Sequence, residues 1–319
     1  MNRDKILALI DPARGRGLEI GALARPAVTR DLGPVEYVDR GTTAELRHAY
    51  RNDVHVTLGD LVEVDHAWGD QALADCVGGT GGHDYVVASH VIEHVPDVLG
   101  WLVEIAAVLR AGGVLSLVIP DKRYTFDVLR RTSSEAELVD AYVRRLRRPG
   151  ARQLFDHFFG ARDLAAEPIA SGRVLPSDPS LEPDAANLLE LCRITEAQGD
   201  YVDCHCWVFT PQSFLAALDL GSRLDLLPFE VAAFAGTEPG TDEFHISLRR
   251  LADDLTPQAR RARFLESRAR FAPAPTPQPN VEELALRART AQAELDALRR
   301  SASWRITAPL RRLASLVRR

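Results

Sequence analysis

The sequence predicts an α/β fold built on a doubly wound, mostly parallel sheet. Two observations support this prediction. Short, strongly apolar runs alternate with helical patterns over the first 120 residues, and each run ends at or within two residues of a glycine, an acid or a histidine. Runs this short and apolar are typical of strands covered on both faces, and their alternation with helices indicates βαβ units.

The strand predictions follow the apolar runs in chain order. The first five strands are expected at 17–20, 35–38, 54–58, 85–89 and 114–119. The runs at 224–236 and 243–251 supply two closing strands. We therefore expect a sheet of seven strands.

Three helix boundaries can be predicted from capping residues. Thr42 and Glu45 form a capping box that opens one helix. A second helix is expected over 96–113, beginning at Pro96 and ending at Gly112. A third, over 210–220, has Thr210 as its N-cap, followed by a proline at the first helical position.

The chain divides into six segments by pattern. Residues 121–209 break the strand–helix alternation and are too long for a simple connection, so we expect an insertion that covers a pocket. The predicted segments are a nucleotide-binding core at 1–120, this insertion, completion of the core at 210–271, a proline-rich linker at 272–280, a short coiled-coil helix at 281–300 and a basic amphipathic tail at 301–319.

Composition narrows the function classes. The 319 residues are 46% hydrophobic and carry a net charge of −6, which argues against a broad nucleic-acid-binding surface. No run is long enough to span a membrane, and the N-terminus does not resemble a secretion signal. We expect a cytoplasmic protein with reduced thiols.

Metal binding is not predicted. The spacing of Cys192, Cys204 and Cys206 does not match the common zinc-finger patterns. In "HVIEH" at 90–94 the glutamate stands beside the second histidine, whereas the zinc-protease motif places it beside the first.

The turn after the first expected strand indicates which cofactor fits. In open α/β sheets, ligands bind at the carboxyl ends of the strands. The sequence "LEIGALARP" offers one glycine, Gly21, beside an acid, Glu19, with Leu23 where a second glycine is expected. A pyrophosphate favours several bare amides and no nearby anion, whereas the sulfonium and ammonium of S-adenosylmethionine suit an acid. Asp39, after the second strand, suits ribose hydroxyls of either that cofactor or NAD.

Residues 15–120 resemble class I S-adenosylmethionine-dependent methyltransferases. The motifs that carry the resemblance are "LEIGALARP", "YVDR", "GD" at 59–60, "DYVVASHVIEHVPD" and "VLRAGGVLSLVIPD". The segments at 120–134, 206–214 and 243–250 resemble a bacterial branch linked with cell-surface polysaccharide synthesis, and "SASWRITAPLRRL" resembles a tail of enzymes in such pathways. The resemblance implies a seven-stranded Rossmann-like methyltransferase fold with S-adenosyl-L-methionine as cofactor.

The same resemblance implies a set of cofactor contacts. It places Glu19 and Gly21 at the methionine end, Asp39 with its neighbour Arg40 at the ribose, Asp60 and Leu61 at the adenine, and Ser89 and His90 near the sulfonium.

The expected reaction is transfer of the methyl group to oxygen, which needs a base to take the hydroxyl proton. Histidine suits that step at neutral pH, so the candidates are His90, first in preference, His94 and His205. We expect Asp121, Lys122 and Arg123, at the end of the fifth strand, to bind the substrate. The alternative for these three is an internal salt-bridged loop.

The expected acceptor is a sugar hydroxyl of a surface polysaccharide or its precursor. Two other functions are considered: a non-catalytic scaffold that recruits glycosyltransferases, and an NAD-dependent sugar oxidoreductase, which the missing glycines disfavour. Residues 281–300 favour self-association or docking on a glycosyltransferase, with a solvated single helix as the alternative. The tail's five arginines and no acid suit peripheral contact with the inner face of an anionic membrane.

Overall fold

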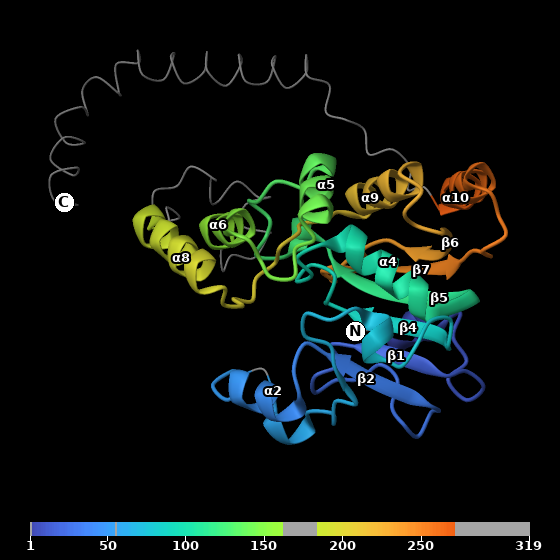
Figure 1. Ribbon diagram of the computed structural model, residues 1–319, viewed down its shortest axis with the longest axis horizontal. Helices are drawn as coiled ribbons and strands as arrows, with labels where there is room; N and C mark the ends of the chain where they lie inside the picture. Colours follow the sequence, from blue (N-terminus) through green and yellow to red (C-terminus); the bar gives the residue numbers. More distant parts are fainter. Residues whose placement is uncertain (1, 55, 162–183, 272–319) are drawn as a thin grey trace, which may run out of the picture. The chain divides into compact units, whose positions relative to one another are not determined.

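The structure is a computed structural model that describes residues 2–54, 56–161 and 184–271 (Figure 1). The chain divides into one compact unit, Met1–Ala272, and a second unit, Pro273–Arg319. The predicted linker, coiled coil and basic tail therefore lie outside the described residues. No helix within the described ranges is long and apolar enough to cross a membrane.

A seven-stranded sheet organises the compact unit, with the strand order β3-β2-β1-β4-β5-β7-β6. The strands up to β5 pair in parallel, and β7 runs antiparallel to both β5 and β6. The strands are β1 Gly17–Ile20, β2 Val35–Asp39, β3 His66–Ala67, β4 His83–Ser89, β5 Leu109–Pro120, β6 Phe229–Ala235 and β7 Glu243–Arg250. This topology confirms the predicted doubly wound, mostly parallel sheet.

The prediction of the third strand was wrong. Residues 58–60 form a short 3-10 helix, and Val54 is 90% exposed, so the apolar run at 54–58 has no sheet to pack on. The strand that pairs with β2 is instead β3, two residues long and without an apolar run of its own. Its position is fixed by polar contacts: the Asp65 carboxylate accepts a hydrogen bond from the Tyr37 amide, and His66 pairs with Glu36.

Two of the three helices predicted from capping residues begin where expected. Thr42 and Thr210 each cap their helix with a capping box, and Pro211 opens the second of these helices. The helix predicted over 96–113 is shorter: Asp97 caps it, and it ends before Leu109, where β5 begins. The helices are α1 Arg3–Leu7, α2 Thr43–Ala49, α3 Leu73–Cys76, α4 Val98–Val108, α5 Glu135–Arg144, α6 Ala151–Gly160, α8 Ala185–Gln198, α9 Pro211–Arg223 and α10 Pro257–Phe271.

Both faces of the sheet are buried, which explains why its strands are apolar at nearly every position. Leu18 and Val86 belong to the larger core, which also contains α4 and α9 side chains. Their strand neighbours Tyr85 and Val87 face the opposite side and pack with Ile6 of α1. Alternate residues of one strand thus serve two cores, as the period of two requires.

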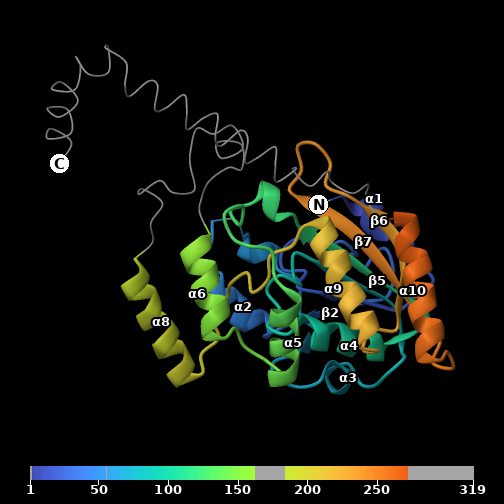
Figure 2. The same ribbon diagram turned by 90° about the horizontal axis from the view of Figure 1, so that it is seen from above.

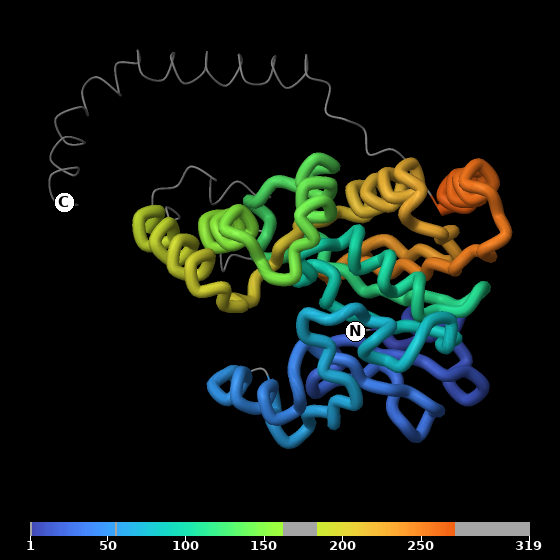
Figure 3. Tube along the Cα trace, in the orientation of Figure 1, coloured from blue at the N-terminus to red at the C-terminus, as the bar shows by residue number. Residues whose placement is uncertain are grey.

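The segment after β5 leaves the sheet and returns to it at α9. It contains α5, α6 and α8, and α6 and α8 lie side by side in both ribbon views (Figures 1 and 2). After α8 the chain runs back in extended form over 200–209, as the yellow part of the tube shows (Figure 3). This extended return brings residues distant in sequence to the carboxyl ends of the strands.

Candidate functional site

A cavity of about 920 Å³ opens at the carboxyl ends of β1, β2 and β4. Its volume lies within the range of roughly 300–1,000 Å³ typical of sites for small molecules and cofactors. The lining residues come from the strand ends, from the start of α4, from the end of α5 and from the extended return; they include Gly21, Asp39, Arg40, Trp68, Gly69, His90, His94, Tyr142, Leu146, Tyr201 and Asp203.

The turn after β1 requires its glycine. Gly21 has a φ of +68°, and a Cβ there would lie 2.6 Å from Cγ2 of Val91. Its amide donates to the carbonyl of Val38, so the turn is tied to the end of β2. Leu23 also has a positive φ, 46°, and lines the cavity. The backbone can therefore approach a ligand closely at Gly21, where no side chain intervenes.

Glu19 does not line the cavity, in contrast to its predicted place at the methionine end. Its carboxylate is 2% exposed and accepts hydrogen bonds from the amides of Ala27 and Val28, at 2.6 and 2.8 Å. Burial raises the pKa of Glu19 to about 7, although the two amides lower it. Glu19 thus fixes the loop that follows Gly21.

Asp39 and Arg40 stand at the end of β2 and face the cavity. The Arg40 amide donates to the Asp39 carboxylate at 2.7 Å. Burial raises the pKa of Asp39 to about 6, although the Arg40 amide and guanidinium lower it. The Arg40 guanidinium lies 3.6 Å from the ring centroid of Tyr201, so the end of β2 contacts the extended return across the cavity.

The predicted adenine and sulfonium contacts are only partly at the cavity. Asp60 is exposed on the 3-10 helix, Leu61 is buried, and Ser89 ends β4; none of the three lines the cavity. Trp68 and Gly69 line it instead, directly after β3. These two residues were not predicted, because the third strand was expected at 54–58.

The three residues predicted to bind substrate contact their own loop rather than the cavity. Asp121 is fully buried and forms an ion pair with Arg123, with 2.6 Å between Oδ2 and Nη2, and it also accepts from the Thr237 hydroxyl. The Lys122 ammonium donates to the carbonyl of Val128, and burial lowers its pKa. None of the three lines the cavity, so the geometry is that of the internal salt-bridged loop considered as the alternative.

His90 follows β4 with a φ of +55° and lines the cavity. Its Nε2 lies 2.9 Å from Oε2 of Glu243, and its Nδ1 lies 3.6 Å from Oε1 of Glu93. Burial lowers the pKa of His90, but the hydrogen bond with Glu243 and the charge of Glu93 outweigh it, so the net pKa is raised. Glu243, from β7, thus orients this ring.

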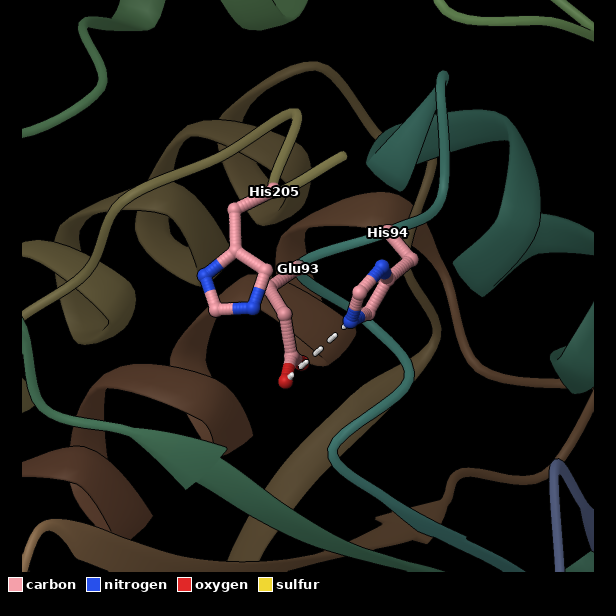
Figure 4. A group of neighbouring side chains, drawn as sticks. All are labelled: Glu93, His94 and His205. Atoms are coloured by element: carbon pink, nitrogen blue, oxygen red, sulfur yellow. Dashed lines mark ion pairs between the residues drawn. The ribbon is translucent and has the colours of Figure 1, made fainter. Parts of the chain in front are cut away.

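His94 and His205 meet at the cavity wall on either side of Glu93 (Figure 4). Their rings pack edge to face, with centroids 4.7 Å apart. The extended return is held in register here, because the Trp207 amide donates to the carbonyl of Glu93 and its indole to that of Val95. Burial lowers the pKa of His94, but the hydrogen bond with Asp203 and the charge of Glu93 outweigh burial. The net effect raises the pKa of His94 to about 9.

A buried ionic network supports His205. Its Nδ1 lies 2.6 Å from Oδ2 of Asp127, and Asp127 pairs with Arg130 at 2.7 Å. Arg130 is fully buried; it also pairs with Asp156 and donates to the His205 carbonyl. Burial raises the pKa of Asp127, but His205 and Arg130 lower it more, so the carboxylate stays ionised. The network fixes the position and orientation of the His205 ring.

The model of a methyltransferase domain family matches residues 2–167, just over half of the chain. The chain belongs to the methyltransferase domain family. Membership of this family implies the use of S-adenosylmethionine. A search of curated protein sequences finds no significant match.

Solved structures similar to the methyltransferase domain include three methyltransferases. An S-adenosylmethionine-dependent methyltransferase from Mesorhizobium loti is 14% identical, with 78% of this chain and 98% of that chain covered and a TM-score of 0.40. The trans-methyltransferase CalH in complex with SAH is 18% identical, with 78% and 54% covered and a TM-score of 0.35. The CurJ carbon methyltransferase is 13% identical, with 77% and 51% covered and a TM-score of 0.36. The chain thus spans about half the length of the last two.

Four further polar residues lie in or near the cavity wall that were not among the predicted site residues. Glu93, Asp127, Tyr201 and Asp203 all lie in or behind the cavity wall. One signal was available: polar and apolar residues alternate from Asp203 to Cys206, as in an extended segment with one polar side. Asp127 carried no such signal, because only the fold brings it to His205.

Proposed function

We propose that this domain transfers a methyl group from S-adenosylmethionine to the oxygen of a sugar hydroxyl, on a surface polysaccharide or its precursor. The observation that carries the cofactor proposal is that Gly21 and Asp39 face one cavity from the ends of two adjacent strands. Gly21 leaves room for the methionyl part, and Asp39 supplies a carboxylate for the ribose hydroxyls. Trp68 and Gly69 follow on the side where an adenine would extend.

The proposed reaction is an in-line displacement. The acceptor oxygen bonds to the methyl carbon while the carbon–sulfur bond breaks, so the sulfonium becomes the thioether of S-adenosylhomocysteine. The hydroxyl proton passes to a base, for which we propose His90. It lines the cavity, and Glu243 orients its ring through Nε2.

Calorimetry tests the cofactor. We expect S-adenosylmethionine and S-adenosylhomocysteine each to bind with one site per chain, and NADH to give no heat. No heat with either S-adenosyl compound at high micromolar concentration would overturn the proposal, and binding of NADH instead would favour the oxidoreductase.

Transfer of label tests the acceptor. With a methyl-tritiated donor, we expect tritium in the polysaccharide fraction of cells that lack the gene, after addition of the purified chain. Mass analysis of that fraction should show a gain of one methyl per acceptor sugar. A chain that binds the donor but labels no glycan would support the scaffold function.

We further propose that residues 281–319 localise the enzyme, through a protein partner at 281–300 or a membrane surface at 301–319. The support is the sequence pattern alone. Deleting 273–319 should leave turnover on a soluble acceptor unchanged and reduce co-sedimentation with anionic vesicles or co-purification of a glycosyltransferase. Loss of turnover in the deletion variant would mean that the segment belongs to the catalytic unit.

A further inference from the structure

Three side chains suited to metal coordination converge at the cavity wall. One ligand atom each of Glu93, His94 and His205 lies within 4.8 Å of the others (Figure 4). We propose that these residues bind a divalent transition-metal ion. Cysteine spacing and the local histidine pair predict no metal, whereas this set brings His205 to Glu93 and His94 from far along the chain.

The Glu93 carboxylate provides the first argument. Glu93 is 2% exposed, and neither carboxylate oxygen has a hydrogen-bond partner within the part of the chain that the structure describes. The nearest cationic atoms are Nδ1 of His90 at 3.6 Å and Nε2 of His94 at 4.0 Å, both beyond hydrogen-bond distance. A buried carboxylate without hydrogen bonds is costly, and a directly bound cation would satisfy it.

The orientation of the two histidines provides the second argument. Nδ1 of His94 lies 3.0 Å from Asp203, and Nδ1 of His205 lies 2.6 Å from Asp127. In each ring, Nε2 is left to face the Glu93 side (Figure 4). Metal-binding histidines characteristically hydrogen-bond a carboxylate through the other ring nitrogen, which fixes the tautomer and the ring orientation.

The donor set indicates the class of metal. Two imidazoles and one carboxylate form the ligand set of catalytic zinc sites and of non-haem iron sites, both of which keep an open position. Metal–ligand bonds of about 2.0–2.2 Å bring tetrahedral ligand atoms to about 3.4 Å apart, so these side chains would close by about 1 Å on binding. The thiols beside His205 are engaged elsewhere: Cys206 donates to the His94 carbonyl and lies 3.8 Å from the Cys204 sulfur.

An ion held there would stand at the wall of the donor cavity, which His94 lines. Its open position would hold the acceptor oxygen and, as a Lewis acid, make the hydroxyl proton easier to remove. The role of the ion in activating the acceptor hydroxyl rests on the proposed function. Binding of the ion itself does not depend on that function.

Cobalt titration of the full chain tests the site without the methyl donor. After chelator treatment and dialysis, we expect one Co²⁺ per chain by calorimetry and by visible absorption, displaced by Zn²⁺. Glu93→Gln and His205→Gln should each weaken Co²⁺ binding at least tenfold, whereas His48→Gln, at an exposed histidine on α2, should bind as the wild type does.

Three outcomes would overturn the inference. The first is that the wild type binds no stoichiometric Co²⁺, a result that does not depend on whether the variants fold. The second is that folded Glu93→Gln and His205→Gln bind Co²⁺ as the wild type does. The third is intense near-ultraviolet charge-transfer absorption, which would identify cysteine ligands. Circular dichroism establishes that the variants fold. If the chain binds Co²⁺ but not S-adenosylmethionine, the metal site stands and the proposed function fails.

Discussion

The two halves of the cavity are built in different ways. The half formed by Gly21, Asp39 and Arg40 uses the ends of two adjacent strands, and its residues are close in sequence. The half lined by His94, with Glu93 and His205 beside it, combines the turn after β4 with the extended return that follows α8. The first half depends on local backbone geometry, and the second depends on a buried ionic network.

This difference has consequences for mutation. In the strand-end half, single polar side chains face the cavity, and their substitution should alter affinity more than folding. In the histidine half, the Asp127–Arg130 pair that supports the His205 ring is buried and charged, so substitution there should alter stability first. The predictions below, ordered from the largest expected effect, test this contrast.

Arg130→Met should give the largest effect, a loss of about 3–5 kcal/mol in the free energy of unfolding. The reason is that Asp127 would remain buried without its cationic partner. Urea unfolding followed by tryptophan fluorescence measures the loss. Arg144→Met is the control, because its pair with Asp140 is exposed and should contribute about 0–1 kcal/mol. Equal losses in the two variants would refute the distinction between the halves.

Asp39→Asn should weaken S-adenosylmethionine binding about 10- to 100-fold, because hydrogen bonds to a charged group are worth about 1.5–3 kcal/mol. Asp31→Asn, at an exposed carboxylate, should leave affinity unchanged. Calorimetry makes the comparison.

The pH dependence of the same binding gives a second test of Asp39. Its pKa is raised to about 6, so the carboxylate is ionised above pH 6 and protonated below it. Affinity should therefore fall as the pH drops through about 6 in the wild type, and this step should be absent in Asp39→Asn. A step that persists in the variant would assign the titration to another group.

Gly21→Ala should cost about 1–2 kcal/mol in stability, since its φ of +68° is unfavourable for a residue with a Cβ. The new methyl would also overlap the Val91 side chain. The double variant Gly21→Ala, Val91→Ala should recover the stability lost through overlap with the Val91 side chain. It should not recover the stability lost through the unfavourable backbone conformation at residue 21. Gly59→Ala is the matched control, because a Cβ there meets no atom within 4 Å. Thermal unfolding with and without the cofactor measures all four proteins.

Tyr201→Leu should give the smallest effect, a two- to fivefold loss of cofactor affinity, because the cation–π contact of an exposed Arg40 is worth about 0.5–1 kcal/mol. Tyr201→Phe keeps the ring and should retain most of the affinity while losing only the hydroxyl bond to Asp203. If the two variants behave alike, the contact between Arg40 and the ring does not contribute to binding.

The sequence predicted most strands of the sheet but only some of the residues that line the cavity. Apolar runs covered on two faces identify β1, β2, β4 and β5 without reference to the rest of the chain. The short β3 lacks such a run and is held by polar contacts, so its position, and with it Trp68 and Gly69, could not be predicted from hydrophobicity.

The predicted site residues divide in the same way. Gly21, Asp39, Arg40 and His90 face the cavity because each directly follows a strand or ends one. Glu19 and Asp121 also sit at strand ends, but nearby amides and arginine satisfy their carboxylates, and sequence alone gives no sign of those partners. The pairing of His205 with Asp127 depends on the path of an insertion that no local pattern specifies.

The number of residues in the extended return determines which side chain stands opposite Glu93. Two hydrogen bonds from Trp207 fix which residue stands opposite Glu93. On either side of His205 is a cysteine, so a slip by one position would exchange an imidazole nitrogen for a sulfur. Removing or adding one residue here would turn a site suited to borderline metals into one that prefers softer ions, even with every ligand residue retained.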